Sequence, residues 1–374
     1  MKLLLSKKSI LKGLEGRLGE DDYLEPLDCL VESFKTEAKF NLAGNLAVRH
    51  QVVNRLRVRS KLNDFIQNKD LPDPADPIFV IGLPRSGTTF LFDLLSCDQK
   101  YRSPLFWEIT RPFPLVSEGS REEAKRIKRT NRELSLARIF IPQLVNMHHI
   151  HAEMPEECSL INTMNIRSFI FMCMANSPAY EDYLKTCDFT MTFLWHKRFL
   201  QALETQRRPK NWLLKDPSHI SHIPEILATY PNAKFIHIHR NPVKSIGSLS
   251  SLTSNVRSGL SNHINPKEVG ERVLEFWQYS INKNLKDRSK YLQPNQIKDI
   301  DYRDFIKNPI KEIQSTYKHF NFELTENTSQ GMQDFINNQS REKHKAHKYS
   351  LEDFGLNESK VQDAFSDYNR IHNF

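Results

Sequence analysis

An apolar run that leads into a glycine-containing loop constrains the fold of this chain more than any other stretch. Residues 77–82 (PIFVIG) are typical of a buried parallel strand because the apolar run is bounded by proline and glycine. The loop ends at residue 87, and apolar residues at helical spacing follow over 90–95. A strand, a glycine loop and a helix start direct several backbone N–H groups and the helix dipole toward one anion. The stretch therefore predicts a phosphate-type site in an α/β fold.

The loop differs at one position from a nucleotide-binding P-loop. Its spacing, Gly82-x4-Gly87-x-Thr89, matches that motif, but Thr88 stands where the motif needs lysine and Arg85 lies inside the loop. The P-loop lysine bridges the β- and γ-phosphates beside Mg²⁺, so its absence argues against ordinary ATP or GTP hydrolysis. An arginine, planar and always charged, suits an oxyanion held by two hydrogen bonds. A merely structural glycine turn before a helix is the alternative.

Composition limits the partners and the compartment that we expect. The 374 residues include 53 lysines and arginines and 45 acidic residues, a formal charge of +8, which suits an anionic cofactor. No long basic tail indicates nucleic-acid binding. Five cysteines without a CxxC pair favour a reducing compartment. No apolar run approaches 18 residues, and the apolar stretch at residues 3–5 is too short for the core of a signal peptide. We expect a cytoplasmic protein without a transmembrane segment, and the sequence leaves homo-oligomerisation open.

The first 70 residues are expected to be helical. Apolar residues recur at helical spacing, first at Leu27, Leu30, Val31 and Phe34 and then at Leu42, Leu46, Val52, Val53, Leu56 and Leu62. A proline-rich segment at 71–77 ends this pattern. We therefore predict a helical extension over 1–70 that packs on a main domain over 71–374.

Two further strands are predicted, each followed by polar residues. Residues 211–215 form a short strand that leads to Lys215 and His219, and a helix over 223–230 follows. Residues 233–239 form another strand, which leads to Arg240. In open parallel sheets, ligand-binding groups gather at the carboxyl ends of the strands. We therefore expect Arg85, Lys215, His219 and Arg240 to lie at one edge of the sheet.

Other polar clusters carry weaker signals. Glu108 lies in an aromatic turn between two prolines, where it could line a pocket or simply be solvated or paired with Arg111. His148, His149 and His151 with nearby glutamates show no metal-binding spacing, so we expect no metal site.

Three motifs, in order, resemble the sulfotransferase superfamily, which uses 3′-phosphoadenosine 5′-phosphosulfate (PAPS). Residues 84–89 (PRSGTT) resemble the 5′-phosphosulfate loop, most closely that of tyrosylprotein and related bacterial sulfotransferases. Arg240 and Ser248 match the pair that holds the 3′-phosphate. Residues 301–309 are similar to a segment whose tyrosine commonly contacts the adenine. The resemblance covers roughly residues 77–325.

The resemblance implies a P-loop-NTPase-like parallel sheet flanked by helices, and a sulfotransferase that needs no metal. It implies in-line transfer of a sulfuryl group from PAPS to the hydroxyl of a small-molecule or lipid-like acceptor. The residues that would bind PAPS are Arg85, Ser86, Gly87, Thr88, Thr89, Arg240, Ser248 and Tyr302. The tail residues Lys345, His347, Lys348 and Tyr349 could close over the cofactor.

Two residues compete for the role of general base toward the acceptor hydroxyl. Lys215-x3-His219 resembles the Lys-x-His segment of cytosolic sulfotransferases with two extra residues, and Glu108 resembles a glutamate of tyrosylprotein sulfotransferases. We favour His219, because its segment leads directly into the strand before Arg240, and we count Arg85 and Lys215 as further catalytic residues. The alternatives for the whole chain are a nucleotide kinase or NTPase, which would need ATP and Mg²⁺, and a nucleotide-binding module without chemistry.

Overall fold

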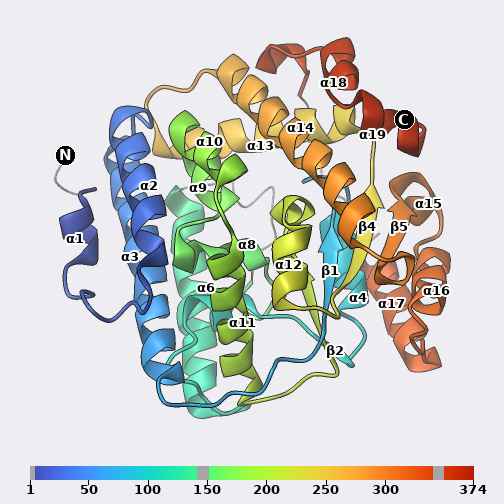
Figure 1. Cartoon of the computed structure of the whole chain (residues 1–374), viewed down its shortest axis with the longest axis horizontal. Helices are drawn as coiled ribbons and strands as arrows, with labels where there is room; N and C mark the ends of the chain where they lie inside the picture. The colour runs from blue at the N-terminus through green and yellow to red at the C-terminus, as the bar shows by residue number, and fades with distance from the viewer. Residues whose placement is uncertain (1–4, 141–150, 340–348) are drawn as a thin grey trace. The chain divides into compact units, whose positions relative to one another are not determined.

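The computed structural model describes residues 5–140, 151–339 and 349–374 (Figure 1). Its contacts divide the chain into two compact units. The first unit comprises Met1–Pro74, Pro104–Arg208 and Leu252–Asn265, and the second comprises Ala75–Ser103, Pro209–Ser251 and Pro266–Phe374. The N-terminal residues thus share a unit with two later segments. The predicted boundary after residue 70 stays a prediction.

The second unit is built on a five-stranded parallel sheet, which confirms the predicted fold class. The strand order is β2-β3-β1-β4-β5. The strands are β1 (Pro77–Ile81), β2 (Tyr101–Arg102), β3 (Asn211–Lys215), β4 (Lys234–His239) and β5 (Ile297–Asp301). The two edge strands are absent from the sequence prediction, because β2 has only two residues and three of the five residues of β5 (IKDID) are charged.

The register of the sheet brings the ends of four strands together. Val80 of β1 pairs with Lys215 of β3, and Ile81 pairs with His237 of β4. His239 pairs in turn with Asp301 at the end of β5. The segments that follow these strands therefore begin at the same edge of the sheet, where parallel sheets bind their ligands.

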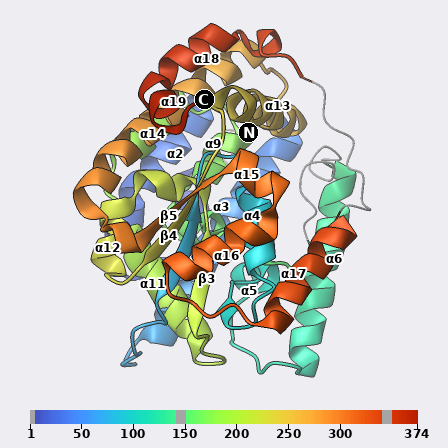
Figure 2. The ribbon, with the colours of Figure 1, turned by 90° about the vertical axis from the view of Figure 1, so that its right-hand side faces the viewer.

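Helices cover both faces of this sheet (Figure 2). On one face, α4 (Thr88–Leu95), α16 (Pro309–His319) and α17 (Glu326–Gln339) contribute Leu91, Ile313 and Met332 to a core that includes Val80 and Ile236. On the other face lie the 3₁₀ helix η3 (Pro217–Ser221), α12 (Ile223–Thr229) and α14 (Pro266–Tyr291). The remaining elements of this unit are η4 (Pro294–Gln296), α15 (Tyr302–Lys307), η5 (Glu352–Phe354), α18 (Glu358–Ala364) and α19 (Ser366–His372). The long helix α13 (Pro242–Leu260) begins in this unit.

The described residues of the first unit are mainly helical. The N-terminal helices are α1 (Lys7–Leu11), η1 (Asp21–Tyr23), α2 (Leu24–Thr36) and α3 (Leu42–Ile66). They are followed by α5 (Phe106–Thr110), α6 (Arg121–Phe140), α8 (Cys158–Asn162), η2 (Thr163–Asn165), α9 (Phe169–Met174), α10 (Pro178–Thr186) and α11 (Thr190–Glu204).

The predicted helical character of residues 1–70 is confirmed for their described part, which begins at residue 5. Leu27 and Leu30 of α2 are fully buried, as expected. Leu42 and Leu46, which continue the same apolar pattern, are 61% and 51% exposed. They occupy the outer side of the first turns of α3, whereas Val48 faces inward and is fully buried.

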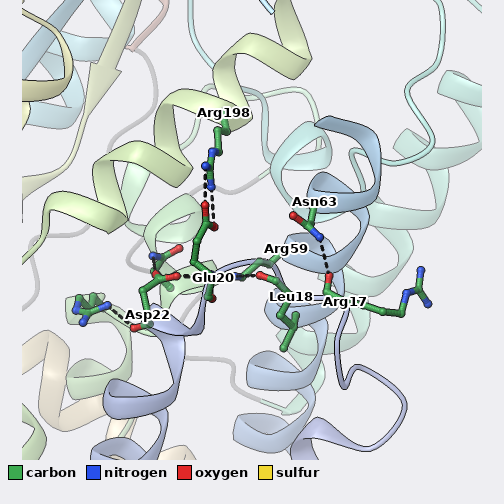
Figure 3. A network of polar contacts seen from close by, with 9 residues as sticks. Arg17, Leu18, Glu20, Asp22, Arg59, Asn63 and Arg198 are labelled. Carbon is green, nitrogen blue, oxygen red and sulfur yellow. Dashed lines mark hydrogen bonds and ion pairs between the residues drawn. The ribbon is translucent and has the colours of Figure 1, made fainter. Parts of the chain in front are cut away.

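A buried arginine ties the N-terminal segment into the first unit (Figure 3). Arg59 of α3 donates to the carbonyl oxygens of Leu18 and Glu20 at 2.7 Å each, and to Asp22. Its guanidinium lies 4.1 Å from the centre of the Trp195 ring of α11. A buried ion pair needs such further hydrogen bonds and contacts to offset the loss of hydration. Arg59 is fully buried, and its hydrogen bonds connect the segment before α2 to α3.

Candidate functional site

The loop between β1 and α4 has the backbone of an anion cradle. Gly82 and Gly87 have φ angles of 154° and 97°, and Arg85 also has a positive φ, 65°. A Cβ atom at Gly82 would lie 2.6 Å from the carbonyl oxygen of Ile238, so only glycine fits there. The Ser86 N–H donates to the carbonyl oxygen of Leu83 at 3.1 Å, which closes the turn. Glycine tolerates these angles without the steric cost that other residues incur.

The same loop contains polar groups that an anion could satisfy. The Ser86 side chain is fully buried, and its Oγ has no hydrogen-bond partner among the described residues. Gly87 precedes the first turn of α4 and offers no side-chain cap to the N–H groups there. Buried hydroxyls and helix N-termini normally find partners. The loop therefore fits an oxyanion at the start of α4.

Two arginines from neighbouring strand ends meet beside this loop. Arg240, just after β4, donates from Nη1 to the carbonyl oxygen of Arg85 at 2.6 Å. Arg85 donates from Nε to Oγ of Ser248 on α13 at 3.2 Å. The loss of hydration and the positive charge of Arg240 both lower the pKa of Arg85. The two like charges repel each other, so an anion placed between them would be stabilised.

Tyr302 completes this group. The Arg240 guanidinium lies 4.2 Å from the centre of the Tyr302 ring, a cation–π contact. A Cβ atom at Gly87 would lie 2.8 Å from the same ring. The predicted residues Arg85, Gly87, Arg240 and Tyr302 thus form one cluster with Ser248.

Lys215 brings a cation to the loop from another strand. Its Nζ donates to Oγ1 of Thr89 at 3.2 Å, and the residue is only 2% exposed. Thr89 belongs to the first turn of α4, next to Thr88, which occupies the position of the P-loop lysine. A lysine is therefore supplied by the end of β3, whereas the P-loop position for lysine holds Thr88.

Sequence reasoning overlooked Gly247 and gave Tyr349 only a loose role in the tail. The Tyr349 ring lies so close to α13 that a Cβ atom at Gly247 would be 2.7 Å from it. Its hydroxyl donates to the carbonyl oxygen of Lys244 at 3.2 Å. Gly247 could have been identified from the sequence, because it directly precedes Ser248. The tail residues Lys345, His347 and Lys348 lie outside the described residues.

His219 lies in η3 and is fully buried. Its ring meets Phe79 of β1 edge-on, with 5.0 Å between the ring centres. Nε2 is 3.9 Å from Oδ2 of Asp216, a carboxylate that also accepts hydrogen bonds from the Ser218 N–H and hydroxyl. Asp216 thus fixes the turn that carries His219.

Glu108 belongs to the first unit, on the short helix α5. It is 6% exposed, so it is buried rather than solvated. Its Oε2 accepts a hydrogen bond of 2.8 Å from the Leu105 N–H. Arg111 forms an ion pair with Glu133, and Arg55 donates to the carbonyl oxygen of Ile109 at 3.1 Å. These contacts hold the helix that positions Glu108.

One group of potential metal ligands occurs within the described ranges. His237, His239 and Asp299 have ligand atoms within 4.8 Å of one another. However, Asp299 accepts from His239 Nε2 at 2.8 Å and from Arg288 at 2.7 Å, and Arg288 also lies 3.4 Å from His237 Nδ1. A cation that is already in place opposes metal binding, so we interpret the group as a hydrogen-bond network. His148 and His149 lie outside the described residues.

Comparison with known proteins identifies relatives of the chain. A model of the sulfotransferase family matches residues 77–326. The omega-hydroxy-beta-dihydromenaquinone-9 sulfotransferase Stf3 of Mycobacterium bovis is 26% identical over 268 residues, which are 67% of this chain and 63% of that protein. The match therefore spans less than two thirds of the length of this curated relative.

Two crystal structures resemble nearly the whole chain. The sulfotransferase STF1 of Mycobacterium tuberculosis has a TM-score of 0.83 and 27% identity, with 98% of both chains covered. The sulfotransferase STF9 of Mycobacterium avium has a TM-score of 0.83 and 25% identity, over 98% of this chain and 96% of that one. None of the helices in the described part of the chain combines the length and apolar character needed to cross a bilayer.

Proposed function

Because the chain belongs to the sulfotransferase family, we propose that it transfers a sulfuryl group from PAPS to an acceptor hydroxyl. The observation that carries this proposal is the cluster of Arg85, Arg240 and Ser248 beside the loop before α4. PAPS has two anionic groups, a 5′-phosphosulfate and a 3′-phosphate, and the cluster offers a separate set of donors to each. PAPS supplies an activated sulfuryl group, and the chain supplies the groups that bind and orient it.

The 5′-phosphosulfate is assigned to the loop. Ser86 has a buried hydroxyl without a partner among the described residues, and Gly87, Thr88 and Thr89 form the start of α4. Backbone N–H groups at a helix start and hydroxyls are the usual ligands of a phosphate group. Gly82 lets the loop approach β4 closely. These features support a cradle for the 5′-phosphate.

Arg240 and Ser248 are assigned to the 3′-phosphate, and Tyr302 to the adenine. Arginine binds phosphate through two parallel hydrogen bonds, which makes it selective for this group. Tyr349 is assigned to the wall of the same nucleotide site, since its ring lies against Gly247, next to Ser248.

Arg85 and Lys215 would stabilise the charge that develops during the reaction. As the S–O bond breaks, negative charge grows on the oxygen that bridged sulfur and phosphorus. Lys215 is buried beside Thr89, where water screens its charge little, and Arg85 lies exposed within the loop itself. Donors already in place at such a site lower the barrier without further reorganisation. This arrangement supports transfer without a metal ion.

The acceptor proton is assigned to His219. It belongs to the same unit as the anion site, and the turn that carries it is fixed by Asp216, whose Oδ2 lies 3.9 Å from Nε2 of His219. Glu108 is the second candidate, because Leu105 holds one of its oxygens and thereby orients the carboxylate.

We propose a lipid-like alcohol as the acceptor. The support is the relative Stf3, whose name gives an omega-hydroxylated menaquinone derivative as its substrate.

The compartment proposed for the protein is the cytoplasm. All five cysteines are free thiols, which agrees with a reducing cytoplasm.

The test is a transfer assay with PAPS and a panel of long-chain and isoprenoid alcohols, followed by mass spectrometry. The proposal predicts a product heavier by one sulfuryl group, formed equally well with excess EDTA. Transfer of phosphate from ATP that requires Mg²⁺ would support a kinase instead. Binding of the product nucleotide 3′-phosphoadenosine 5′-phosphate (PAP) without turnover of any alcohol would support a binding module.

A further inference from the structure

Helix α3 carries an unusual combination of exposed side chains. From Leu42 to Asn63 it contains five lysines and arginines and no acidic residue. Its exposed positions Leu42, Leu46, His50, Arg57 and Lys61 recur at helical spacing and share one side of the helix; we call them the α3 stripe. The next acidic residue on this side, Asp64, is neutralised by an ion pair with Arg17.

The stripe is apolar at one end and basic at the other. Leu42 and Leu46 are 61% and 51% exposed, which makes them two of the most exposed large apolar side chains among the described residues. A hollow of about 460 Å³ along the stripe is lined by Leu46, Ala47, Arg49, His50, Val53 and Arg57. Cationic and apolar groups therefore line one concave surface.

Helix α1 extends the basic surface. It lies alongside α3 (Figure 1), and Arg49 donates to the carbonyl oxygen and hydroxyl of Ser9 at 3.2 Å each. On the same short helix, Lys8 is exposed, and Lys12 directly after it is exposed as well. Lys7 pairs with Asp28, and the charge of Lys12 contributes to lowering the pKa of Glu15, whereas no ion pair is recorded for Lys8 among the described residues. The stripe thus borders further positive charge.

We propose that the α3 stripe docks the protein on the surface of an anionic lipid bilayer. Cations favour anionic headgroups by about 1 kcal/mol each near the surface, and exposed leucines gain energy by entering the headgroup boundary. A nucleic acid would gain from the cations but not from the two leucines. A second copy of the chain would bring the same positive charge and be repelled. Only the bilayer uses both halves of the stripe.

Vesicle sedimentation of the full-length protein without PAPS tests the docking surface, so its result is independent of transfer activity. Wild-type protein should bind phosphatidylglycerol-containing vesicles at low salt, with weaker binding in 0.5 M NaCl and little on pure phosphatidylcholine, because salt screens exposed charges. Arg57→Glu with Lys61→Glu should reduce binding at least tenfold. Leu42→Ser with Leu46→Ser should reduce it severalfold while leaving the salt dependence in place.

Matched substitutions elsewhere serve as controls. Lys311 and Lys318 on α16 are exposed lysines, and Ile371 on α19 is 55% exposed. The pair Lys311→Glu and Lys318→Glu, and separately Ile371→Ser, should bind like wild type. Thermal melts should show that all variants are folded, since every changed side chain is exposed.

Three results would overturn the proposal. The first is equal binding by the stripe variants and the controls. The second is that wild-type protein binds duplex DNA or transfer RNA more tightly than the anionic vesicles, and that the double variant Arg57→Glu, Lys61→Glu loses this nucleic-acid binding. The third is a wild-type dimer in light scattering that the Leu42→Ser, Leu46→Ser pair converts to a monomer, because the stripe would then be a subunit interface.

Discussion

The Arg240 side chain donates a hydrogen bond of 2.6 Å to the backbone carbonyl oxygen of Arg85. The bond connects the end of β4 with the loop after β1. A residue assigned to the 3′-phosphate therefore also supports the loop assigned to the 5′-phosphosulfate. For this reason Arg240→Ala would disturb both halves of the site, and Ser248→Ala is the cleaner probe of the 3′-phosphate.

The contact between Tyr349 and α13 predicts that Gly247→Ala weakens nucleotide binding. The new methyl group would lie 2.7 Å from the Tyr349 ring, so the ring must move. We expect the Kd for PAP, measured by calorimetry, to rise about tenfold, as small-to-large changes at packed positions commonly cost about 1–3 kcal/mol. The control is Gly331→Ala, where a Cβ atom meets nothing within 4 Å. Unchanged affinity in Gly247→Ala would remove Tyr349 from the nucleotide site.

The two cations at the loop should affect turnover more than binding of the acceptor. Arg85→Ala and Lys215→Ala should each lower kcat by about 10²–10³-fold, the usual effect of removing one preorganised donor. Lys234→Ala is the matched control, because Lys234 begins the strand β4 whose other end leads to Arg240. Steady-state kinetics with a saturating acceptor measure the effect. Wild-type kcat in both variants would mean that the loop is only structural.

The identity of the base is tested by a pair of substitutions. If His219 accepts the proton, His219→Gln should lower kcat by about 10²–10⁴-fold and leave the Kd for PAP unchanged. Glu108→Gln should then have a smaller effect. Because His219 is fully buried against Phe79, thermal melts must accompany the kinetics. A nearly normal His219→Gln beside an inactive Glu108→Gln would transfer the role to Glu108.

Acid should destabilise the protein from about pH 6.5 downward. Burial lowers the pKa of His196 and of His372 to about 3. These side chains bind protons more readily in the unfolded chain, where histidine has a pKa of about 6.5. The stability that they contribute is therefore fully present above pH 6.5 and is lost as the pH falls toward 3.

Thermal melts between pH 7.5 and 4 measure this effect. The Tm of wild type should fall across the range, and His196→Gln should fall less steeply. The exposed His263 provides the control, since His263→Gln should follow wild type. A wild-type Tm that stays constant down to pH 4 would contradict the prediction.

The sequence predicted the centre of the sheet well because β1 is a continuous apolar run and apolar residues form the middle of β3 and half of β4. It also predicted that Arg85, Lys215 and Arg240 follow strand ends, which parallel register then brings to one edge. The edge strand β5 could not be recognised, since three of its five residues are charged. Gly247 and Tyr349 are separated by about a hundred residues, and no local pattern reveals a contact of that kind.

The exposed leucines of α3 illustrate another limit. Leu42 and Leu46 share the helical spacing of the buried residues of α3, but periodicity cannot show where neighbouring helices end. Only the tertiary structure reveals that the first turns of α3 project these side chains outward.

The most direct test of the account is a comparison of PAP with adenosine 5′-monophosphate (AMP) by calorimetry on the wild-type protein. The two nucleotides differ only in the 3′-phosphate, which is assigned to Arg240 and Ser248. A charge-assisted contact contributes about 1.5–3 kcal/mol, so PAP should bind about 10- to 100-fold more tightly than AMP. Ser248→Ala should reduce this ratio severalfold. Equal Kd values for PAP and AMP would contradict the assignment of the anion site to PAPS.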